Sequence, residues 1–289
     1  MTQTNIERDR VESFIEAIDH YTPREEGFAE TFPLFSRFLS RSIDARYISE
    51  HPIQDLLDTI FATLKATQKR DRDEIIVRIL PAQENPETQG TLIVCMPTQP
   101  FITSTIRLAL EKLKVKSARH ISASVPIKRN KSKLITQIGL TKSPKETIFW
   151  QDIECHDLPK EQNLIVETIH ARLKAAQCAV SDFPKMHTRL KTIAEHFEEK
   201  AKTQKIGGAD LESHARLLRW MLNENFVVLG MRSLSLNPTG KDNDALGIGN
   251  SHVSPCINYT KKNADEWLKN NDAILDIRKS QTESWIYRS

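Results

Sequence analysis

Gly247 and Gly249 form the segment that comes nearest to a phosphate-binding loop. Dinucleotide sites need three glycines at fixed offsets, because the backbone must approach the pyrophosphate closely, and His252 occupies the third position here. His252 and Cys256 also have the spacing of two zinc ligands, but no second pair completes a site. Motifs for a serine nucleophile or a Walker loop are absent from the sequence. We therefore predict a surface loop here, and no catalytic, cofactor-binding or metal-binding residue in the chain.

The turn from Met96 to Phe101 is the one segment with the character of a binding site. It leads from an apolar strand into an amphipathic helix, whose first backbone amides are available to an anion such as a carboxylate. The candidate effector-binding residues are Thr98, Phe101, Thr103, Ser104 and Thr105. The alternative is that the hydroxyls only cap the helix, and we expect capping to be their commoner role.

Residues 73–180 predict an α+β domain that would position this turn. Strand patterns cover Glu74–Leu80, Thr91–Met96, Ile121–Arg129, Leu134–Leu140 and Thr147–Cys155. Helical spacing of apolar residues follows the turn, from Ile102 to Leu113, and returns at Glu161–Val180. We interpret this order as a ferredoxin-like βαββαβ sandwich, with helices on one face of a mostly antiparallel sheet.

The opposite face of such a sheet needs a second cover. Helical patterns precede the sheet at Ile6–His20, Phe32–Ser40 and Ile53–Thr67, and Asp44–His51 is predicted to be a connection. The amino-terminal helices, a second copy of the domain or a partner could each supply the cover. The one-sided layering therefore predicts self-association.

The carboxyl-terminal third is predicted to contain further helices and an incomplete domain. Asp182 and Pro184 have the positions of a helix cap and a first-turn proline, which predicts a separate helix at Asp182–Lys202. A helix at Leu211–Asn223 and an apolar strand at Asn225–Met231 follow. The last residues form an aromatic strand pattern without a later partner, so we expect a chain that is cut short.

The composition excludes several classes of protein. At 289 residues with 39% hydrophobic residues, the chain fits about two domains. A net charge of +3 gives no reason to predict nucleic-acid binding, and the basic stretch Lys114–Lys133 is interpreted as a solvated hairpin edge. No secretion signal or membrane-spanning run is present in the sequence. The four scattered cysteines predict reduced thiols in the cytoplasm.

Several segments resemble the large-subunit bacterial NAD-specific glutamate dehydrogenases. Residues 100–110 (Pro-Phe-Ile-Thr-Ser-Thr-Ile-Arg-Leu-Ala-Leu) resemble that family's Pro-Phe-Leu-Val-Asp-Ser-Val-x-x-x-Leu segment. Residues 180–186 are similar to its Val-x-Asp-Trp-x-x-Met, and residues 226–232 to its Phe-Thr-Phe-Leu-Gly-Tyr-Arg. The resemblance runs from about Ile53 to the last residue. Ser104 stands where the family has an aspartate, and Ser122 where it has a histidine.

The resemblance implies a chain several times longer, whose dehydrogenase core lies downstream and uses NAD to convert glutamate and water to 2-oxoglutarate and ammonia. It implies an amino-terminal helical segment (1–70), an ACT-like domain (71–181), a helical connector (182–224) and the start of a PAS-like domain (225–289). These residues would form a non-catalytic regulatory and oligomerisation region, with an amino acid as effector and the dehydrogenase core as partner. The alternative is a stand-alone ACT-like sensor or scaffold for a small ligand.

Overall fold

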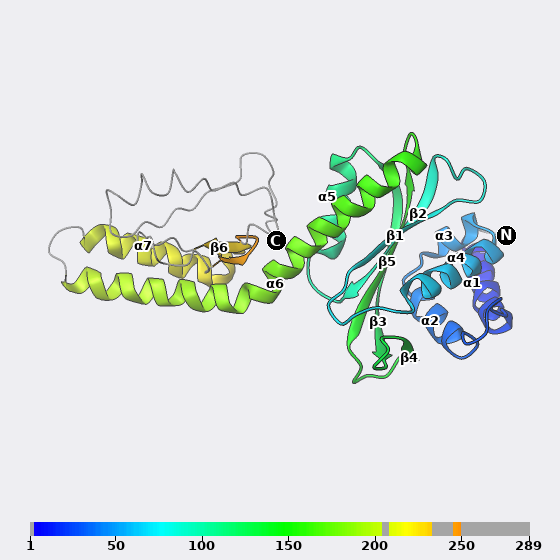
Figure 1. Cartoon of the computed structure of the whole chain (residues 1–289), viewed down its shortest axis with the longest axis horizontal. Coiled ribbons are helices and arrows are strands. Elements are labelled where there is room, and N and C mark those ends of the chain that lie inside the picture. The colour runs from blue at the N-terminus through cyan, green and yellow to red at the C-terminus, as the bar shows by residue number, and fades with distance from the viewer. Residues whose placement is uncertain (1–2, 204–207, 233–244, 250–289) are drawn as a thin grey trace. The chain divides into compact units, whose positions relative to one another are not determined.

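The strand patterns form one sheet, seen at the centre of the first unit in Figure 1. The structure is a computed structural model that describes residues 3–203, 208–232 and 245–249. The sheet contains β1 (Ile76–Pro81), β2 (Gln89–Pro97), β3 (Lys116–Arg129), β4 (Ile135–Ile138) and β5 (Lys145–Glu154). Its order is β1-β2-β5-β3-β4, and every neighbouring pair is antiparallel. The chain divides into two compact units, Met1–Leu173 and Lys174–Ser289.

Two helices cover one face of this sheet. They are α5 (Ile102–Lys112) and α6 (Leu158–Thr203), and within the first unit they pack on alternate residues of β2. Leu92, Val94 and Met96 are fully buried there, because every second side chain of a strand points to the same face. The α+β class predicted from the sequence is confirmed.

The amino-terminal helices cover the other face (Figure 1). They are α1 (Gln3–His20), α2 (Thr31–Ser40), α3 (Ala45–Glu50) and α4 (Ile53–Thr67). Their apolar residues share one core with Ile148 and Trp150 of β5 and with Ile121 of β3. The chain thus covers both faces of its own sheet, which removes the observation on which the predicted self-association rested. The predicted connection Asp44–His51 was wrong, because Asp44 caps α3 by accepting a hydrogen bond from the amide of Arg46.

The predicted βαββαβ order was wrong at the edge of the sheet. In the described residues no strand after α6 joins the sheet, and β1, which precedes the β2-α5-β3 unit, occupies the edge beside β2. Strands β2 and β3 are separated by β5, so this unit is a split βαβ arrangement. Hydrophobic patterns locate the strands along the chain but do not determine which strands are neighbours.

The predicted break between two helices near residue 182 is also wrong. Helix α6 is continuous over 46 residues with Pro184 inside it. A proline within a helix costs about 3 kcal/mol, because it removes an amide donor and crowds the preceding turn. Ala179 and Met186, on either side of Pro184 in the helix, are both buried. Asp182 does not start a helix; its carboxylate accepts a hydrogen bond from the amide of Gly247 at 3.0 Å.

The second unit is smaller in its described part. Helix α7 (Gly208–Trp220) leads into the irregular turn η1 (Met221–Asn225), and β6 (Gly230–Arg232) pairs with β7 (Ala245–Gly247). Leu218 packs with Leu190 and Ala194 of α6 in a small core. Of the predicted strand Asn225–Met231, only the last two residues lie in β6. Most of the predicted PAS-like region lies outside the described residues.

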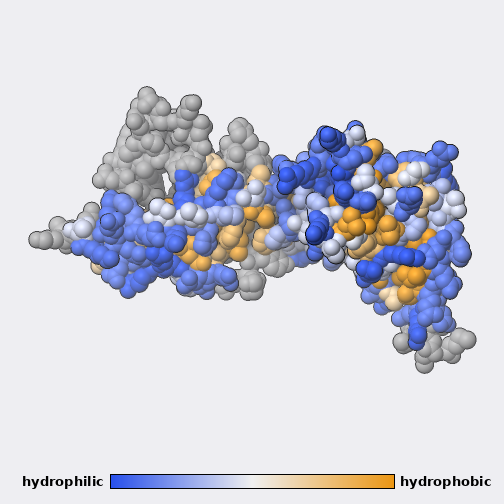
Figure 2. Space-filling view, turned by 90° about the horizontal axis from the view of Figure 1, so that it is seen from below, coloured by the Kyte–Doolittle hydropathy of each residue, from blue (hydrophilic) through white to orange (hydrophobic). Residues whose placement is uncertain are grey.

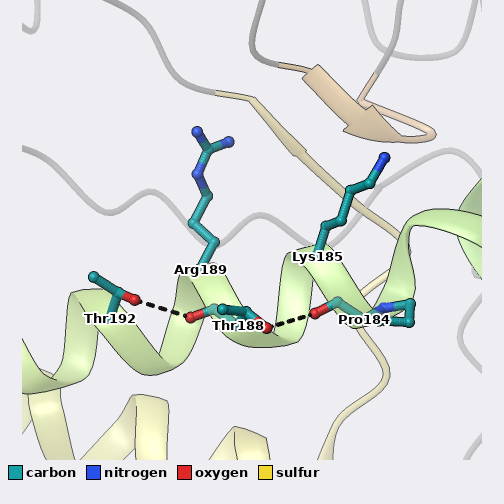
Figure 3. A pocket seen from close by; sticks show the side chains of 5 residues that line it. All are labelled: Pro184, Lys185, Thr188, Arg189 and Thr192. Carbon is teal, nitrogen blue, oxygen red and sulfur yellow. Dashed lines mark hydrogen bonds between the residues drawn. The ribbon is translucent and has the colours of Figure 1, made fainter.

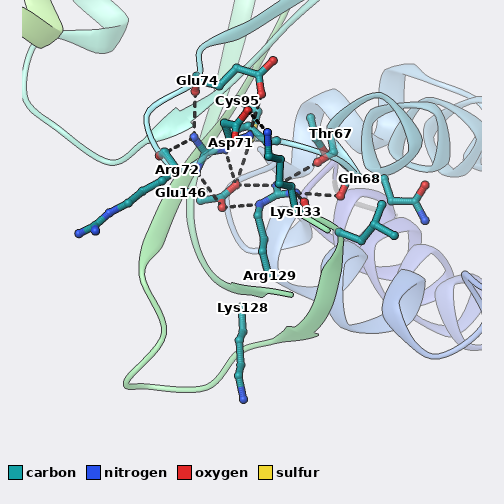
Figure 4. Close-up of polar contacts among 12 residues, drawn as sticks. Thr67, Gln68, Asp71, Arg72, Glu74, Cys95, Lys128, Arg129, Lys133 and Glu146 are labelled. Carbon is teal, nitrogen blue, oxygen red and sulfur yellow. Dashed lines mark hydrogen bonds and ion pairs between the residues drawn. The ribbon is translucent and has the colours of Figure 1, made fainter. Parts of the chain in front are cut away.

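A buried ionic cluster joins the amino-terminal helices to the sheet (Figure 4). Glu146 of β5 is 2% exposed, and each of its carboxylate oxygens contacts the guanidinium groups of both Arg70 and Arg129. Arg129 also donates to the carbonyl oxygens of Thr67 and Gln68, at 2.9 and 2.8 Å. These carbonyls are at the carboxyl end of α4, where a helix lacks internal donors. We call Glu146, Arg70 and Arg129 the Glu146 cluster.

The two arginines keep Glu146 ionised. Burial by itself would raise the pKa of this carboxyl, but the hydrogen bonds from Arg129 and Arg70 outweigh burial and lower its pKa to about 2. The Cys95 thiol donates to the same carboxylate at 3.3 Å, and burial raises its pKa. Cys95 is therefore a hydrogen-bond donor in the core and no nucleophile.

Replacement of Glu146 by Gln should strongly destabilise the first unit. The change leaves two buried guanidinium groups without their counter-charge, at a cost of about 3–5 kcal/mol in the free energy of unfolding. Urea denaturation measures this difference. Glu154→Gln, in the same strand but exposed, is the matched control and should change stability by less than about 0.5 kcal/mol. Equal stability of the two variants would contradict the role given to the Glu146 cluster.

The same carboxyl should make stability depend on acid pH. Its pKa is lower in the folded chain, at about 2, than its ordinary value of 4.5. The stabilisation is therefore present above pH 4.5 and is lost as the pH falls toward 2. We expect the stability difference between the native chain and Glu146→Gln to shrink over this window, as measured by denaturation at several pH values. A constant difference would show that Glu146 does not titrate there.

Candidate functional site

The predicted binding turn lies at one end of the sheet, between β2 and α5. Phe101 precedes the helix with φ 72° and ψ 3°. This is the left-handed backbone conformation, which residues other than glycine rarely adopt. Its ring is 40% exposed. The backbone is thus held in an unfavourable conformation where the chain enters α5.

The five candidate residues are not equivalent. Phe101 occupies the N-cap position of α5 and makes no side-chain cap, and among the described residues none of the candidate hydroxyls accepts a hydrogen bond from the first amides of the helix, so the capping expected from the sequence is not seen there. The Ser104 hydroxyl instead donates to the carbonyl of Phe101 at 3.2 Å. Thr105 is buried on the core side of the helix, whereas Thr103 is half-buried and Thr98 is exposed. The first amides of α5 therefore lack a side-chain acceptor from the described residues.

Thr98 belongs to a hydroxyl cluster that the sequence did not reveal. Its Oγ1 lies 3.1 Å from Ser124 Oγ of β3 and accepts a hydrogen bond of 3.1 Å from Thr147 Oγ1 of β5. Ser124 and Thr147 are directly opposite each other in the sheet. Only the register of β3 against β5 brings these residues together, so the sequence carried no signal beyond their strand positions. We call Thr98, Ser124 and Thr147 the hydroxyl cluster.

Polar groups gather at this end of the sheet. Gln99, which follows Thr98, has an amide nitrogen that is buried without a hydrogen-bond partner among the described residues. Amide donors and hydroxyls suit a carboxylate or a similar anion. The described residues contain no group of three or more metal-ligating side chains. The arrangement can therefore bind and orient a ligand, and it offers no evident pair of nucleophile and base.

A groove lies beside β3, on the side of the amino-terminal helices. It has a volume of about 320 Å³ and is lined by Ser42, Asp44, Tyr47, Arg119, His120 and Ile121. Arg119 and Asp44 form an exposed ion pair at 3.3 Å along it. Tyr47 donates a 2.5 Å hydrogen bond to Asp152 of β5, and burial, together with this carboxylate, raises the pKa of Tyr47. We call this feature the α3–β3 groove.

A second hollow follows one face of α6 in the second unit (Figure 3). Its volume is about 530 Å³, and Lys185 and Arg189 extend from the helix in the same direction. The hydroxyl of Thr188 donates to the carbonyl of Pro184 at 2.9 Å, and that of Thr192 to Thr188 at 3.2 Å. All its lining residues lie within 184–192 of one helix, so no second described element contributes to it.

On the face drawn in Figure 2, apolar residues form orange patches among the blue of hydrophilic residues. Among the described residues of the first unit, the large apolar residues that are more than one-third exposed are Ile15, Leu34, Phe101, Leu140 and Leu164. They come from separate helices and loops and include only one residue of the candidate site. In the described residues no helix is both long and apolar enough to cross a membrane.

The conformation of Phe101 gives a direct test of the turn geometry. Phe101→Val should destabilise the first unit by about 1–2 kcal/mol, because a β-branched residue fits the left-handed region poorly, whereas Phe101→Asn should be tolerated. Leu164→Val in α6 is an exposed control with a cost below about 0.7 kcal/mol. Chemical denaturation of the three variants measures the order. Equal effects of Val and Asn at position 101 would be incompatible with the observed backbone.

No protein-family model matches the chain. A comparison with curated proteins finds the NAD-specific glutamate dehydrogenase of Halomonas elongata, with 22% identity over 205 residues. The match covers 68% of this chain but 13% of the relative, so the chain spans a small part of that protein's length. The similarity supports a relation to NAD-specific glutamate dehydrogenases and fits a region of such an enzyme.

Proposed function

We propose that the chain is a non-catalytic regulatory and assembly region of a large, cytoplasmic NAD-dependent glutamate dehydrogenase. The observation that carries this proposal is the similarity to a glutamate dehydrogenase of which the chain matches only 13%. In this proposal the dehydrogenase core and its NAD site belong to the rest of the polypeptide. The covered sheet and the binding turn are consistent with a region that receives ligands or neighbouring domains.

The finer proposal is that residues 71–181 form an ACT-like domain and residues 225–289 begin a PAS-like domain. The split β2-α5-β3 unit and the helices on one face of the sheet support the first assignment. The edge strand β1 departs from the simple order, because it precedes the unit instead of following α6. The second assignment rests on the sequence resemblance.

We assign amino-acid effector binding to the turn between β2 and α5. Among the described residues no side chain caps the first amides of α5, and Thr98 of the same turn belongs to the hydroxyl cluster. A carboxylate at these amides would take the place of the missing cap. Phe101, Thr103 and Ser104 would contact the ligand, Thr98 would orient it, and buried Thr105 would support the helix from the core side.

A stand-alone ligand sensor or scaffold is the second candidate function, favoured by the sheet of the first unit, both faces of which are covered by helices of the same chain. The mass of the mature protein in its natural source separates the two. A polypeptide several times longer than this chain supports the dehydrogenase region, and a mature chain of this length supports the independent sensor.

Two binding experiments test the proposed function. The chain should show no saturable binding of NAD in isothermal titration and no glutamate oxidation, and tight NAD binding would overturn the assignment. A thermal-shift screen of free amino acids should identify a ligand that raises the melting temperature. Thr103→Asp, which places a negative charge at the amides, should abolish that shift, whereas Thr136→Asp on exposed β4 should not. A shift retained in Thr103→Asp would exclude this turn as the site.

A further inference from the structure

Most of one edge of β3 has no partner in the described part of the chain. On one side β3 pairs with β5 from Lys116 to Pro126. On the other side it pairs with β4 only through Ile127–Arg129, at one end of the strand (Figure 1). The segment Lys116–Val125 therefore presents an edge to which no described strand is added. We call this segment the open edge.

The backbone groups that face outward along this edge can be identified. The amide of Ile127 donates to Pro144 on the β5 side, whereas the carbonyl of Pro126 accepts from Gly139 on the β4 side. Successive residues of a strand point their backbone groups to opposite sides. Ser122 and Ser124 share the direction of Pro126, so their N–H and C=O groups face the open edge. Both residues are exposed.

Side chains and charge beside the open edge define what it can bind. The α3–β3 groove lies along Arg119–Ile121 and provides a pocket of about 320 Å³ next to the strand. No aspartate or glutamate occurs between Lys112 and Lys133, a segment that includes the whole of β3. Adding an acidic strand to a sheet edge requires a row of unpaired backbone groups, a neighbouring pocket for a side chain, and positive charge.

The charges argue against a second copy of this chain as the occupant. Two copies of the open edge would bring the same basic residues, Lys116 and Arg119, to one interface, and neither copy has an acidic residue in this segment to pair with them. Charge complementarity therefore favours an acidic partner over a second copy. The bulge between Ser117 and His120 also disturbs one end of the edge, as edges that avoid self-pairing often do. The uncharged stretch Ile121–Val125 lies beyond this bulge.

We propose that the open edge of β3 binds an acidic, extended segment of another protein, which joins the sheet as an additional strand. The outward groups of Ser122 and Ser124 supply the main-chain hydrogen bonds. Arg119 and Lys116 exchange their exposed ion pairs with Asp44 and Glu154, which stabilise the chain little, for acidic side chains of the segment. An apolar side chain of the segment enters the α3–β3 groove against Tyr47. Ser124 belongs to the hydroxyl cluster through its side chain and to the open edge through its backbone groups. The test measures binding of a peptide and not of an amino acid, so it does not depend on the proposed function.

The test uses a dye-labelled peptide, acetyl-Glu-Val-Glu-Val-Glu-Val-Glu-amide, and the full chain. We expect a saturable rise in fluorescence anisotropy that weakens with salt, and no saturable rise with the Lys-Val analogue. A version with alternating N-methylated amides should lose binding, because it cannot form the ladder. If the methylated peptide bound as tightly as the unmethylated one, charge attraction alone would explain the binding and the proposal would be overturned. The absence of saturable binding would overturn it as well.

Matched variants locate the contact. Ser122→Pro removes one outward N–H without affecting the pairing with β5 and should weaken binding at least about tenfold, whereas Ser122→Ala should bind normally. Arg119→Glu should weaken binding more than Lys131→Glu, which changes the net charge equally but lies in the β3–β4 turn. Equal effects within either pair would overturn the assignment.

Hydrogen exchange gives a readout that does not depend on any variant folding. The peptide should slow exchange of the Ser122 and Ser124 amides, whereas those of Ala123 and Val125 already face β5 and should change little. Protection elsewhere on the chain without protection of Ser122 and Ser124 would place the peptide at another surface. Sedimentation showing a peptide-independent dimer through β3 would contradict the choice of an acidic partner.

Discussion

The carboxylate of Glu146 lies between two guanidinium groups, and three separate parts of the first unit must meet to place it there. Glu146 comes from β5 and Arg129 from β3, while Arg70 comes from the segment between α4 and β1. A buried ion that loses its partners is strongly destabilising, so arrangements that leave the carboxylate unpaired are excluded. Because Arg129 also binds the last carbonyls of α4, the cluster fixes the helical layer on the sheet. The covered face and the α3–β3 groove both depend on this attachment.

Periodicity in the sequence was sufficient to locate most elements. The β-branched run at 75–79, the apolar run at 91–96 and the alternating run at 147–155 all became strands, because each must bury at least one face. Short polar connections join β1 to β2 and β3 to β4 as antiparallel neighbours. The strand order across the rest of the sheet could not be predicted, because β1 or a strand after α6 could each occupy the edge beside β2. Asp182 and Pro184 predicted the start of a separate helix, but α6 continues through Pro184 with buried residues on both sides of it.

The candidate site was only partly predictable for the same reason. A strand followed by a hydroxyl-rich helix start was visible in the sequence, and it identified Thr98 and Ser104. Ser124 and Thr147 joined Thr98 through the register of β3 on β5, which no local pattern encodes. The left-handed conformation of Phe101 was equally hidden, since phenylalanine does not favour it. The same register determines which amides of β3 face outward.

The early position of β1 in the chain has a consequence for biosynthesis. If the edge strand of a sheet follows the last helix in the sequence, the sheet cannot be completed until that strand has left the ribosome. Here every strand of the sheet has been synthesised by Glu154, and the core on the α6 side needs only the residues up to Leu173. Since domains generally fold as units in amino-to-carboxyl order during synthesis, the first unit can close while the rest of the polypeptide is still being translated.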